Sequence, residues 1–319
     1  MSWVNYALTL LVAFSIYVIV GAGLNLVAGY CGRLTLAHGA LYGAGAYAYT
    51  LVSMAASTTV LPYAGFIIAA GVSALLSVFL ALPERRLRGD FFIIASLALQ
   101  AILFSLFQNW HTPGEPVGSW QNLTNGTAGI SGVPRPLLLD TSLAMFAMFA
   151  SAAAFATVLV IRTLVQSPWG RLIRATRDDR LVAEGLGKGV LRARVEAFAI
   201  AGATAGLGGA LYAAYARYVS PDLGSVNMSV LFLSMVLIGG LGTIKGPVVG
   251  AATLLALEEG VRLLRVSDTI RANLPFLAES GFTDANLQLL VYGVLLVVLL
   301  RFRPQGLAGD HLAASVRSH

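Results

Sequence analysis

Charged side chains are scarce in this 319-residue chain, because only 11% of its residues are Asp, Glu, Lys or Arg, against about 25% in an ordinary soluble domain. Hydrophobic residues make up 57%. A chain with so few charges cannot build a water-facing surface, which excludes a soluble globular protein. Cys31 is the one cysteine, so an internal disulfide framework is excluded and this residue is expected to pack as a small apolar side chain. The composition indicates an integral membrane protein.

Long apolar runs are what the chain has in abundance. Stretches of about 17–25 residues are long enough to cross the hydrocarbon core of a bilayer. The first run lacks a positive n-region and a small-residue cleavage site, so it is expected to remain in the mature protein. We therefore predict an all-α, polytopic transmembrane helical bundle that forms a single domain over residues 1–319. The predicted spans, about nine, lie near 4–28, 39–57, 63–82, 91–109, 140–161, 195–216, 226–242, 247–264 and 286–302.

The positive residues divide unequally between the two sides of the membrane. Alternating the spans places 16 Lys and Arg residues on one side and 5 on the other, whereas the acidic residues divide 7 to 8. Because Lys and Arg accumulate in cytoplasmic loops, the side with 16 is predicted to be the cytoplasm. The amino terminus then lies outside and the carboxyl terminus inside. The net charge of +6 is thus explained by membrane orientation and not by nucleic-acid binding.

Two polar segments are unusually long. Residues 110–139 are rich in Gly and Pro and are predicted to form an irregular outer loop. Residues 162–194 are predicted to be cytoplasmic and to contain an amphipathic helix. Ser167 with Pro168 is a typical helix start, and Gly185 with Gly187 is a typical stop. We expect this helix to dock into a soluble partner, while a helix lying on anionic lipid headgroups is the alternative.

Glycine and proline interrupt two of the apolar regions. The stretch "GYCGRLTLAHGALYGAGAYAYT" (29–50) holds five glycines, and "LIGGLGTIKGPVVGAA" (237–252) combines spaced glycines with Pro247. Non-helical backbone is tolerated at membrane depth only where protein or water surrounds it, so a broken helix in the first stretch would line a path. A plain turn followed by a helix that packs through Gly39 and Gly43 explains it equally well. Paired interruptions in corresponding positions of two halves are typical of an inverted repeat with a transport route at its interface.

Weakly polar residues are expected along such a route. For each one, a hydrogen bond between helices is the alternative explanation. The candidates are Asn25, Thr35, His38, Gly39, Ser96, Gln100, Asn227, Gly239 and Gly240.

The sequence offers no energy source of its own. The segments "GLGKGV" (185–190) and "GGLGTIKGP" (239–247) lack the spacing and the Ser or Thr after Lys that a phosphate-binding loop requires. No ionisable residue stands in the middle of a predicted span, which weighs against a proton-coupled carrier. No metal-ligand cluster or nucleophile and base pair appears within the spans, which weighs against a membrane-embedded enzyme. Any ATP is therefore expected to be hydrolysed by another subunit.

Several motifs, in order along the chain, resemble a known family. They are "GLNLVAGYCGRLTLAHGALYGAGAY" (23–47), "RLRGDFFIIASLA" (86–98), "SPWGRLIRATRDD" (167–179), "GGALYAAYARYVSPD" (208–222), "MVLIGGLGTIKGPVVGAA" (235–252) and "RFRPQGLAG" (301–309). This pattern is similar to the permease subunits of bacterial branched-chain amino-acid ABC importers from about residue 20 to 309. It is closer to the longer permease of the usual pair.

The resemblance implies partners and a coupling segment. A second, homologous permease would complete a heterodimer, two cytoplasmic ATPases would bind ATP and Mg²⁺, and a periplasmic protein would deliver the solute, so this chain itself would hold no cofactor. Residues 167–187 would form the coupling helix, in which the usual acidic and alanine residues are reduced to "AEG" at 183–185. The residues implied in coupling are Ser167, Trp169, Gly170, Arg171, Arg174, Ala175, Arg177, Asp178, Ala183, Glu184, Leu186 and Gly187.

The prediction is a non-enzymatic permease subunit of the bacterial inner membrane, which moves branched-chain or other hydrophobic amino acids by alternating access while partner ATPases hydrolyse ATP. A permease of a sister ABC system for urea, short amides or aromatic acids is the nearest alternative. A self-sufficient secondary carrier or channel is the rival from a different class.

Overall fold

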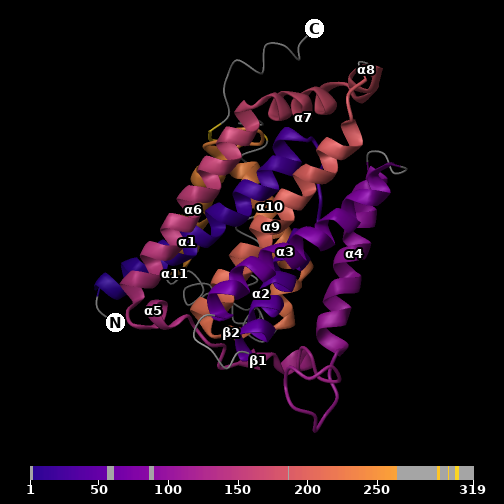
Figure 1. Cartoon of the computed structure of the whole chain (residues 1–319). Coiled ribbons are helices and arrows are strands. Elements are labelled where there is room, and N and C mark those ends of the chain that lie inside the picture. The colour runs from indigo at the N-terminus through magenta and orange to yellow at the C-terminus, as the bar shows by residue number, and fades with distance from the viewer. Residues whose placement is uncertain are drawn as a thin grey trace, which may run out of the picture. The chain divides into compact units, whose positions relative to one another are not determined.

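Helices dominate the computed structural model of the chain (Figure 1). The structure describes residues 3–55, 61–85, 90–185, 187–263, 293–294, 301 and 306–308. The chain divides into two compact units, Met1–Leu233 and Ser234–His319. The α-helices are α1 (Trp3–Asn25), α2 (His38–Met54), α3 (Leu61–Ala81), α4 (Asp90–Asn109), α5 (Leu137–Asp140), α6 (Leu143–Gln166), α7 (Pro168–Asp178), α8 (Arg180–Gly185), α9 (Val190–Ala216), α10 (Val226–Gly239) and α11 (Gly246–Leu263). A π-helical turn, η1 (Leu26–Tyr30), extends α1, and 3₁₀ turns form η2 (Leu82–Arg85), η3 (Gly126–Ala128) and η4 (Pro221–Gly224).

Helices occupy each predicted span that the structure describes. Five of them, within the described residues, are long and apolar enough to cross a membrane: Trp3–Tyr30, Pro62–Ala81, Phe91–Asn109, Leu143–Gln166 and Val190–Ala216. The helix α2 has 17 residues, α10 has 14 and α11 has 18. The ninth predicted span, 286–302, lies almost entirely outside the described residues.

The core of the first unit is built from α2, α3 and α9, which pack closely through small residues. A Cβ atom added to Gly45 of α2 would lie 2.3 Å from Cα of Gly206 on α9. A Cβ on Gly209 would lie 2.0 Å from the carbonyl oxygen of Tyr42. Side-chain hydrogen bonds add to these contacts, since Ser77 Oγ of α3 donates to the carbonyl of Phe198 on α9 at 2.6 Å. Close backbone approach with polar contacts is how membrane helices associate, because apolar side chains gain little over lipid.

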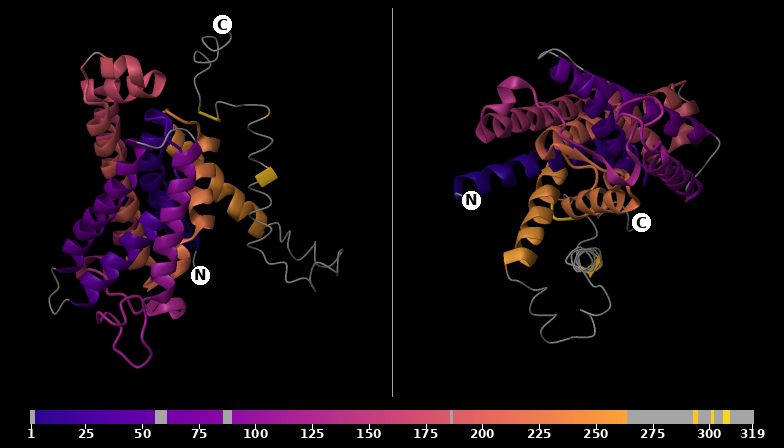
Figure 2. Two further views of the ribbon diagram at one scale, coloured as in Figure 1. Left: turned by 90° about the vertical axis from the view of Figure 1, so that its right-hand side faces the viewer. Right: turned by 90° about the horizontal axis from the view of Figure 1, so that it is seen from below.

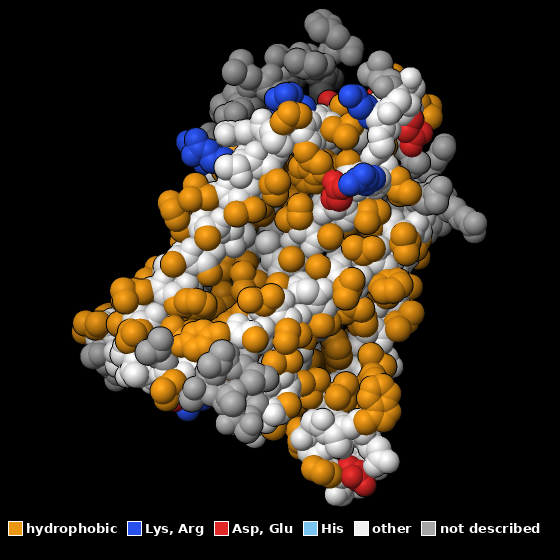
Figure 3. All heavy atoms as spheres, in the orientation of Figure 1, with side chains coloured by type: hydrophobic (Ala, Val, Ile, Leu, Met, Phe, Trp, Pro, Cys, Tyr) orange, Lys and Arg blue, Asp and Glu red, His pale blue; other side chains and the backbone are white. Residues whose placement is uncertain are grey.

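The face of the molecule shown in Figure 3 supports the membrane assignment. Hydrophobic side chains cover its middle, and most charged side chains gather toward the end that carries α7 and α8. Exposed apolar residues on the long helices include Ile67 of α3, Ile102 of α4 and Phe155 of α6, each more than 60% exposed. Side chains of this kind on a surface this extensive fit hydrocarbon as the surrounding solvent.

The two ends of the first unit differ. At one end, α7 and α8 lie across the ends of α6 and α9 (Figures 1 and 2). At the other, the predicted outer loop is mostly irregular, but it also contains η3 and β1 (Ile130–Ser131). Strand β1 pairs antiparallel with β2 (Tyr218–Val219), Ile130 opposite Val219. The loop is fixed to the helices by Arg135, whose Nε donates to the carbonyl of Ala214 on α9 at 2.5 Å.

Candidate functional site

The chain breaks its helical path between α1 and α2. The turn η1 ends at Tyr30, and residues 31–37 are not helical. Gly32 has φ +71°, a conformation that favours glycine, and an added Cβ would lie 2.7 Å from Cγ of Arg177. Within the break, Cys31, Thr35 and Ala37 are buried, whereas Gly32 and Leu34 are exposed, so protein surrounds it only in part. The close packing that the alternative explanation required is also present, because a Cβ on Gly43 would lie 2.8 Å from Cα of Gly224.

A buried polar cluster closes the amino-terminal end of α2. The first amides of a helix have no partner within it, and Ala37 at the N-cap cannot accept a hydrogen bond through its side chain. Other helices supply the acceptors: the N–H of Gly39 donates to Ser229 Oγ at 2.8 Å, and the N–H of Ala40 donates to Gln100 Oε1 at 2.9 Å. Ser229 Oγ in turn donates to Gln100 Oε1 at 3.1 Å.

Gln100 is the centre of this cluster. Its Nε2 donates to the carbonyl of Gly224 in η4, so one amide joins α2, α10 and η4 to α4. Both Gln100 and Ser229 have 0% exposure. The cluster is therefore a buried network of hydrogen bonds at the point where α2, α4, α10 and η4 meet.

Ser96 and Thr35 extend the cluster toward the break. Ser96 Oγ of α4 accepts from the N–H of Leu36 at 3.0 Å, and Thr35 Oγ1 accepts from the N–H of Ala37 at 3.2 Å. The structure thus brings together four of the candidate route residues predicted from the sequence, Thr35, Gly39, Ser96 and Gln100.

Asn25, His38 and Asn227 are the other candidates in the first unit. Asn25 is buried where α1 passes into η1. His38 is 1% exposed, and its Nε2 has no hydrogen-bond partner among the described residues. Asn227 is exposed on α10, whereas Ser229, two positions further along, makes the polar contact. Sequence reasoning missed Ser229; the hydrophobic run around it gave no signal for which of the two faces inward.

The second glycine-rich stretch, in the second unit, forms a tight turn between α10 and α11. Gly239 ends α10, and Gly240 has φ +112°. A Cβ on Gly239 would lie 2.0 Å from the carbonyl oxygen of Gly246, so the turn admits no side chain there. Thr243 Oγ1 caps the start of α11 by accepting from the N–H of Gly246 at 3.0 Å. The carbonyl of Gly239 accepts from the N–H of Ala308 at 3.0 Å.

The predicted amphipathic segment consists of two helices. Ser167 is the N-cap of α7, accepting from the N–H of Gly170, and Pro168 is its first residue. The predicted stop at Gly185 agrees with the end of α8. The helix is interrupted at Asp179, however, because Asp179 Oδ1 accepts from the N–H groups of Leu181 and Val182 at 2.8 and 3.1 Å. An Asp in this position caps a new helix instead of continuing the old one.

One face of α7 is fixed to the helix bundle. Ile173 is fully buried against Tyr30 and Cys31 at the break. Arg177 Nη1 donates to the carbonyl of Gly29 in η1, and Arg174 Nη2 donates to the carbonyl of Val165 at 3.1 Å. Two hydrogen bonds join α7 to α9: Arg194 Nη2 donates to the carbonyl of Thr176 at 2.6 Å, and Trp169 Nε1 donates to Glu196 Oε2 at 2.8 Å. Gly170 packs closely against the end of α6, since an added Cβ would lie 2.1 Å from the carbonyl oxygen of Val165.

The opposite face of α7 and most of α8 have no cover within the described chain. Leu181 and Val182 are 69% and 60% exposed, and sequence reasoning did not single them out. Apolar side chains so exposed beside acidic residues at the charged end are typical of a docking site. Of the residues predicted in coupling, Ala183 is buried and Leu186 lies outside the described residues. The exposed ones are Arg171, Arg174, Ala175, Arg177, Asp178, Glu184 and Gly187.

A comparison with protein families identifies the chain's relatives. The profile described as "Branched-chain amino acid transport system / permease component" matches residues 6–300 of the 319. The chain belongs to this family. It is accordingly a multi-pass membrane protein and a transport subunit, the permease component of a branched-chain amino acid ABC transport system, and not an enzyme.

Individual relatives agree with this assignment. The permease is 30% identical to the high-affinity branched-chain amino acid transport system permease protein LivM of Salmonella typhimurium and to that of Escherichia coli, over 92% of this chain and 67% of each relative. It is 25% identical to the corresponding protein LivH of Escherichia coli, over 92% of both chains. LivM is the longer of these two relatives, as the coverage shows, and the predicted likeness to the longer permease is confirmed. No solved structure gives a significant match.

Proposed function

We propose that this permease is the transmembrane subunit of an ATP-driven importer that carries branched-chain or other hydrophobic amino acids across the bacterial inner membrane by alternating access. The proposal rests mainly on α7, which has one face fixed to the helix bundle and another face exposed. Its inner face holds the break after α1 through Arg177 and the carbonyl of Gly29, and the α7 and α8 surface beside it is exposed. An element fixed to a break on one side and open on the other is suited to transmit a partner's movement.

The partners in this proposal are those of an ABC importer. A second, homologous permease forms a heterodimer with this chain, and the existence of both LivM and LivH among its relatives supports such a pair. Two cytoplasmic ATPases bind ATP and Mg²⁺ and dock on the exposed surface of α7 and α8. A periplasmic binding protein delivers the solute. No cofactor is assigned to this chain.

The proposed topology has nine spans in a single permease domain, with the amino terminus outside and the carboxyl terminus in the cytoplasm. The excess of Lys and Arg on one predicted side supports it. The basic end with α7 and α8 is then cytoplasmic, and the loop with β1 is periplasmic. The glycine-rich interruptions at 29–45 and 239–246 support an inverted repeat, with the route at its interface.

The polar cluster around Gln100 is the proposed gate of the route. Its groups are neutral, and a small zwitterion needs neutral hydrogen-bonding partners along its way more than fixed charges of one sign. In the closed arrangement Gln100 and Ser229 satisfy the first amides of α2. When α7 moves the break, α2 would separate from α4, and its free amides would then face the solute. A helix amino terminus with free N–H groups favours a carboxylate.

Two charge-reversal variants distinguish residues that bind the ATPase from residues that transmit its movement to the transport route. Arg171 and Arg177 are both exposed on α7, and Arg177 also donates to the carbonyl of Gly29 at the break. In vesicles containing the permease pair, its ATPases and binding protein, Arg171→Glu should weaken ATPase association, which a pull-down measures. Arg177→Glu should leave ATPase association intact but lower the amount of solute imported per ATP hydrolysed. The double variant Arg174→Glu with Arg177→Glu should do the same. Arg162→Glu, exposed at the end of α6, is the control and should change neither.

Fully coupled uptake by Arg177→Glu would overturn the transmission role. Uptake driven by an ion gradient in vesicles that contain this chain without an ATPase would instead establish a secondary carrier. Competition by urea, short amides or aromatic acids, with no effect of leucine, would assign a sister ABC system.

A further inference from the structure

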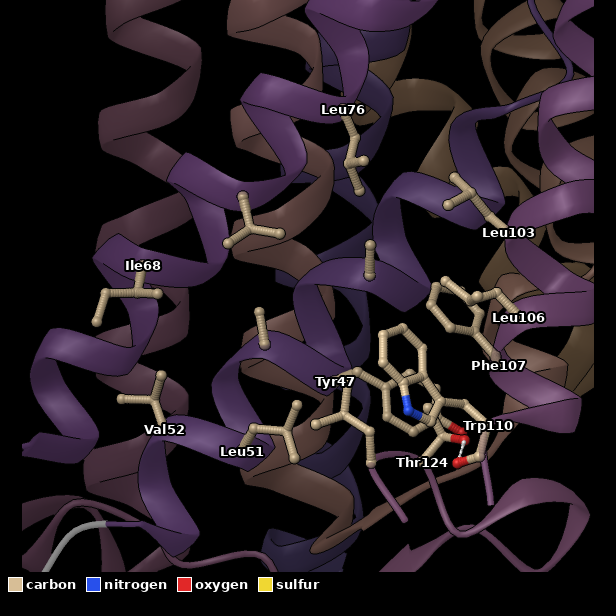
Figure 4. A pocket seen from close by; sticks show the side chains of 14 residues that line it. Tyr47, Leu51, Val52, Ile68, Leu76, Leu103, Leu106, Phe107, Trp110 and Thr124 are labelled. Atoms are coloured by element: carbon tan, nitrogen blue, oxygen red, sulfur yellow. Dashed lines mark hydrogen bonds between the residues drawn. The ribbon is translucent and has the colours of Figure 1, made fainter. Parts of the chain in front are cut away.

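Buried charge is rare in the part of the protein that the structure describes. The pocket between α2, α3 and α4 is lined mainly by apolar side chains such as Leu51 and Leu103, and none of its lining residues is charged (Figure 4). Of the Lys, Arg, Asp and Glu side chains whose burial the structure describes, Arg194 of α9 alone is buried, at 3% exposure. Taking a guanidinium out of water is costly unless its donors find acceptors, so the contacts of Arg194 matter.

Arg194 binds the carboxyl-terminal end of α7. Its Nη2 donates to the carbonyl of Thr176 at 2.6 Å, and its Nε donates to Thr176 Oγ1 at 3.3 Å. Thr176 lies in the last turn of α7, where carbonyl groups lack partners within the helix and form the negative end of its dipole. The buried guanidinium therefore supplies both a hydrogen-bond donor and a charge of favourable sign.

The same carbonyl group would be used if α7 continued. In an unbroken helix, the N–H of residue 180 donates to the carbonyl of residue 176. The helix α7 instead ends at Asp178, and the backbone of Asp179 is extended, with φ −149° and ψ 110°. Arg194 thus occupies the acceptor that the next helical turn would need.

Asp179 stabilises the other side of this interruption, residues 176–182, which we call the joint. Its Oδ1 accepts from the N–H groups of Leu181 and Val182. In an unbroken helix these two groups would donate to the carbonyls of residues 177 and 178. Two side chains from different parts of the sequence therefore end α7 and start α8, which Figure 1 shows as a separate short helix at the end of α7.

We propose that Arg194 and Asp179 are positioning residues for energy coupling: they keep α7 and α8 as two helices and so fix the direction in which α8 presents Leu181 and Val182 to the ATPase. This inference rests on the proposed function, in which α8 is part of the docking surface. A fixed joint passes a movement of α8 to α7, and α7 passes it to the break through Arg177. Without Arg194, the N–H of residue 180 takes the carbonyl of Thr176, α7 lengthens, and α8 changes direction.

Removing the guanidinium is the first test. Arg194→Met keeps an apolar side chain of similar length, a kind of change that buried charges often tolerate without loss of the fold. In vesicles containing the permease pair, its ATPases and binding protein, this variant should lower the solute imported per ATP hydrolysed severalfold. Arg192→Met makes the same chemical change on α9, where the side chain is 87% exposed, and should leave this ratio unchanged. A wild-type ratio in Arg194→Met would overturn the proposal.

Proline at position 180 distinguishes positioning from general stability. Proline has no N–H, is favoured at the first position of a helix, and requires an extended residue before it, as Asp179 already is. Arg180→Pro added to Arg194→Met therefore prevents α7 from lengthening and should restore the ratio to near the wild-type value. Arg180→Ala keeps the N–H and should not restore it. A role of Arg194 in stability alone predicts no rescue by proline, so absence of rescue would overturn the proposal.

Asp179→Ala tests the joint from its other side, and it keeps the test decisive if Arg194→Met does not fold. Asp179 is exposed, so this variant removes the cap of α8 without disturbing the interior. It should also lower the solute imported per ATP, and Arg180→Pro should again restore the ratio. A wild-type ratio in Asp179→Ala would contradict the proposal.

A distance measurement separates failure of this inference from failure of the proposed function. Spin labels at the exposed positions of Arg171→Cys and Glu184→Cys are measured by electron paramagnetic resonance in the permease pair without ATPases. Thirteen residues of unbroken helix span about 20 Å, and Arg194→Met should shift the distances toward this value. Unchanged distances would overturn this inference alone. Shifted distances with unchanged coupling would overturn it together with the proposed docking surface on α8.

Discussion

Replacing Gln100 with leucine should destabilise the permease more than any other single polar change on α4. Gln100 accepts from the N–H of Ala40 and the hydroxyl of Ser229, and it donates to the carbonyl of Gly224. A hydrogen bond between helices in a membrane protein contributes about 0.6 kcal/mol on average, so three account for about 2 kcal/mol. The N–H of Ala40 also stays buried without an acceptor, which adds about 1–2 kcal/mol. We therefore expect a loss of about 3–4 kcal/mol.

The assay is thermal unfolding of the purified, full-length chain in detergent with its partner subunits bound. A loss of this size should lower the unfolding midpoint by roughly 5–10 °C. Gln108→Leu makes the same chemical change two turns further along α4, outside the cluster, and should shift the midpoint by no more than about 1 °C. An unchanged midpoint in Gln100→Leu would refute the reasoning, since the cluster would then not hold α2 to α4.

Two further changes test the packing and the docking surface. Gly45→Leu places a side chain where even a Cβ would be 2.3 Å from Gly206, so a loss of about 1–3 kcal/mol is expected from overpacking. In the matched control Gly71→Leu, nothing lies within 4 Å of the added Cβ, and an equal loss there would contradict the packing argument. Leu181→Asp with Val182→Asp should abolish co-purification of the ATPases while the unfolding midpoint stays the same, and retained ATPase binding would show that these exposed side chains are not the docking site.

Much of the helical architecture could be predicted from the sequence, because the length of an apolar run and the residues that start or stop a helix are local signals. Hydrophobic runs located the long helices to within a few residues, and Ser167 with Pro168 marked the start of α7. The pairing of β1 with β2 could not be foreseen. It joins residues nearly ninety positions apart, and its two-residue strands leave no periodic pattern to read.

The interior of the candidate site was predicted in part. Gln100 and Ser96 were conspicuous as polar residues in an apolar run, and the structure places them on neighbouring turns of α4 facing the start of α2. The choice between Asn227 and Ser229 depends on which face of α10 meets α2, and composition does not encode that rotation. The break at Asp179 could have been found, since Asp followed by a short apolar run is a helix start.

The arginines of α7 make contacts within the chain that the sequence did not reveal. Charge alone suggested that Arg174 and Arg177 face a soluble partner. Both are exposed, and both also donate to carbonyl groups of the permease itself, which hold the helix to the bundle. Sequence spacing shows which residues share a helix face but not which face is covered.

Labelling of a single thiol tests the central claim most directly, namely that α8 lies at the cytoplasmic face and binds the ATPase. The native Cys31 is buried, at 1% exposure, so Val182→Cys provides an accessible position at which a membrane-impermeant maleimide can react. We predict labelling in inside-out vesicles stripped of ATPase, protection when the ATPase is added back, and no labelling in right-side-out vesicles. Labelling in right-side-out vesicles, or labelling that added ATPase leaves unchanged, would contradict the account.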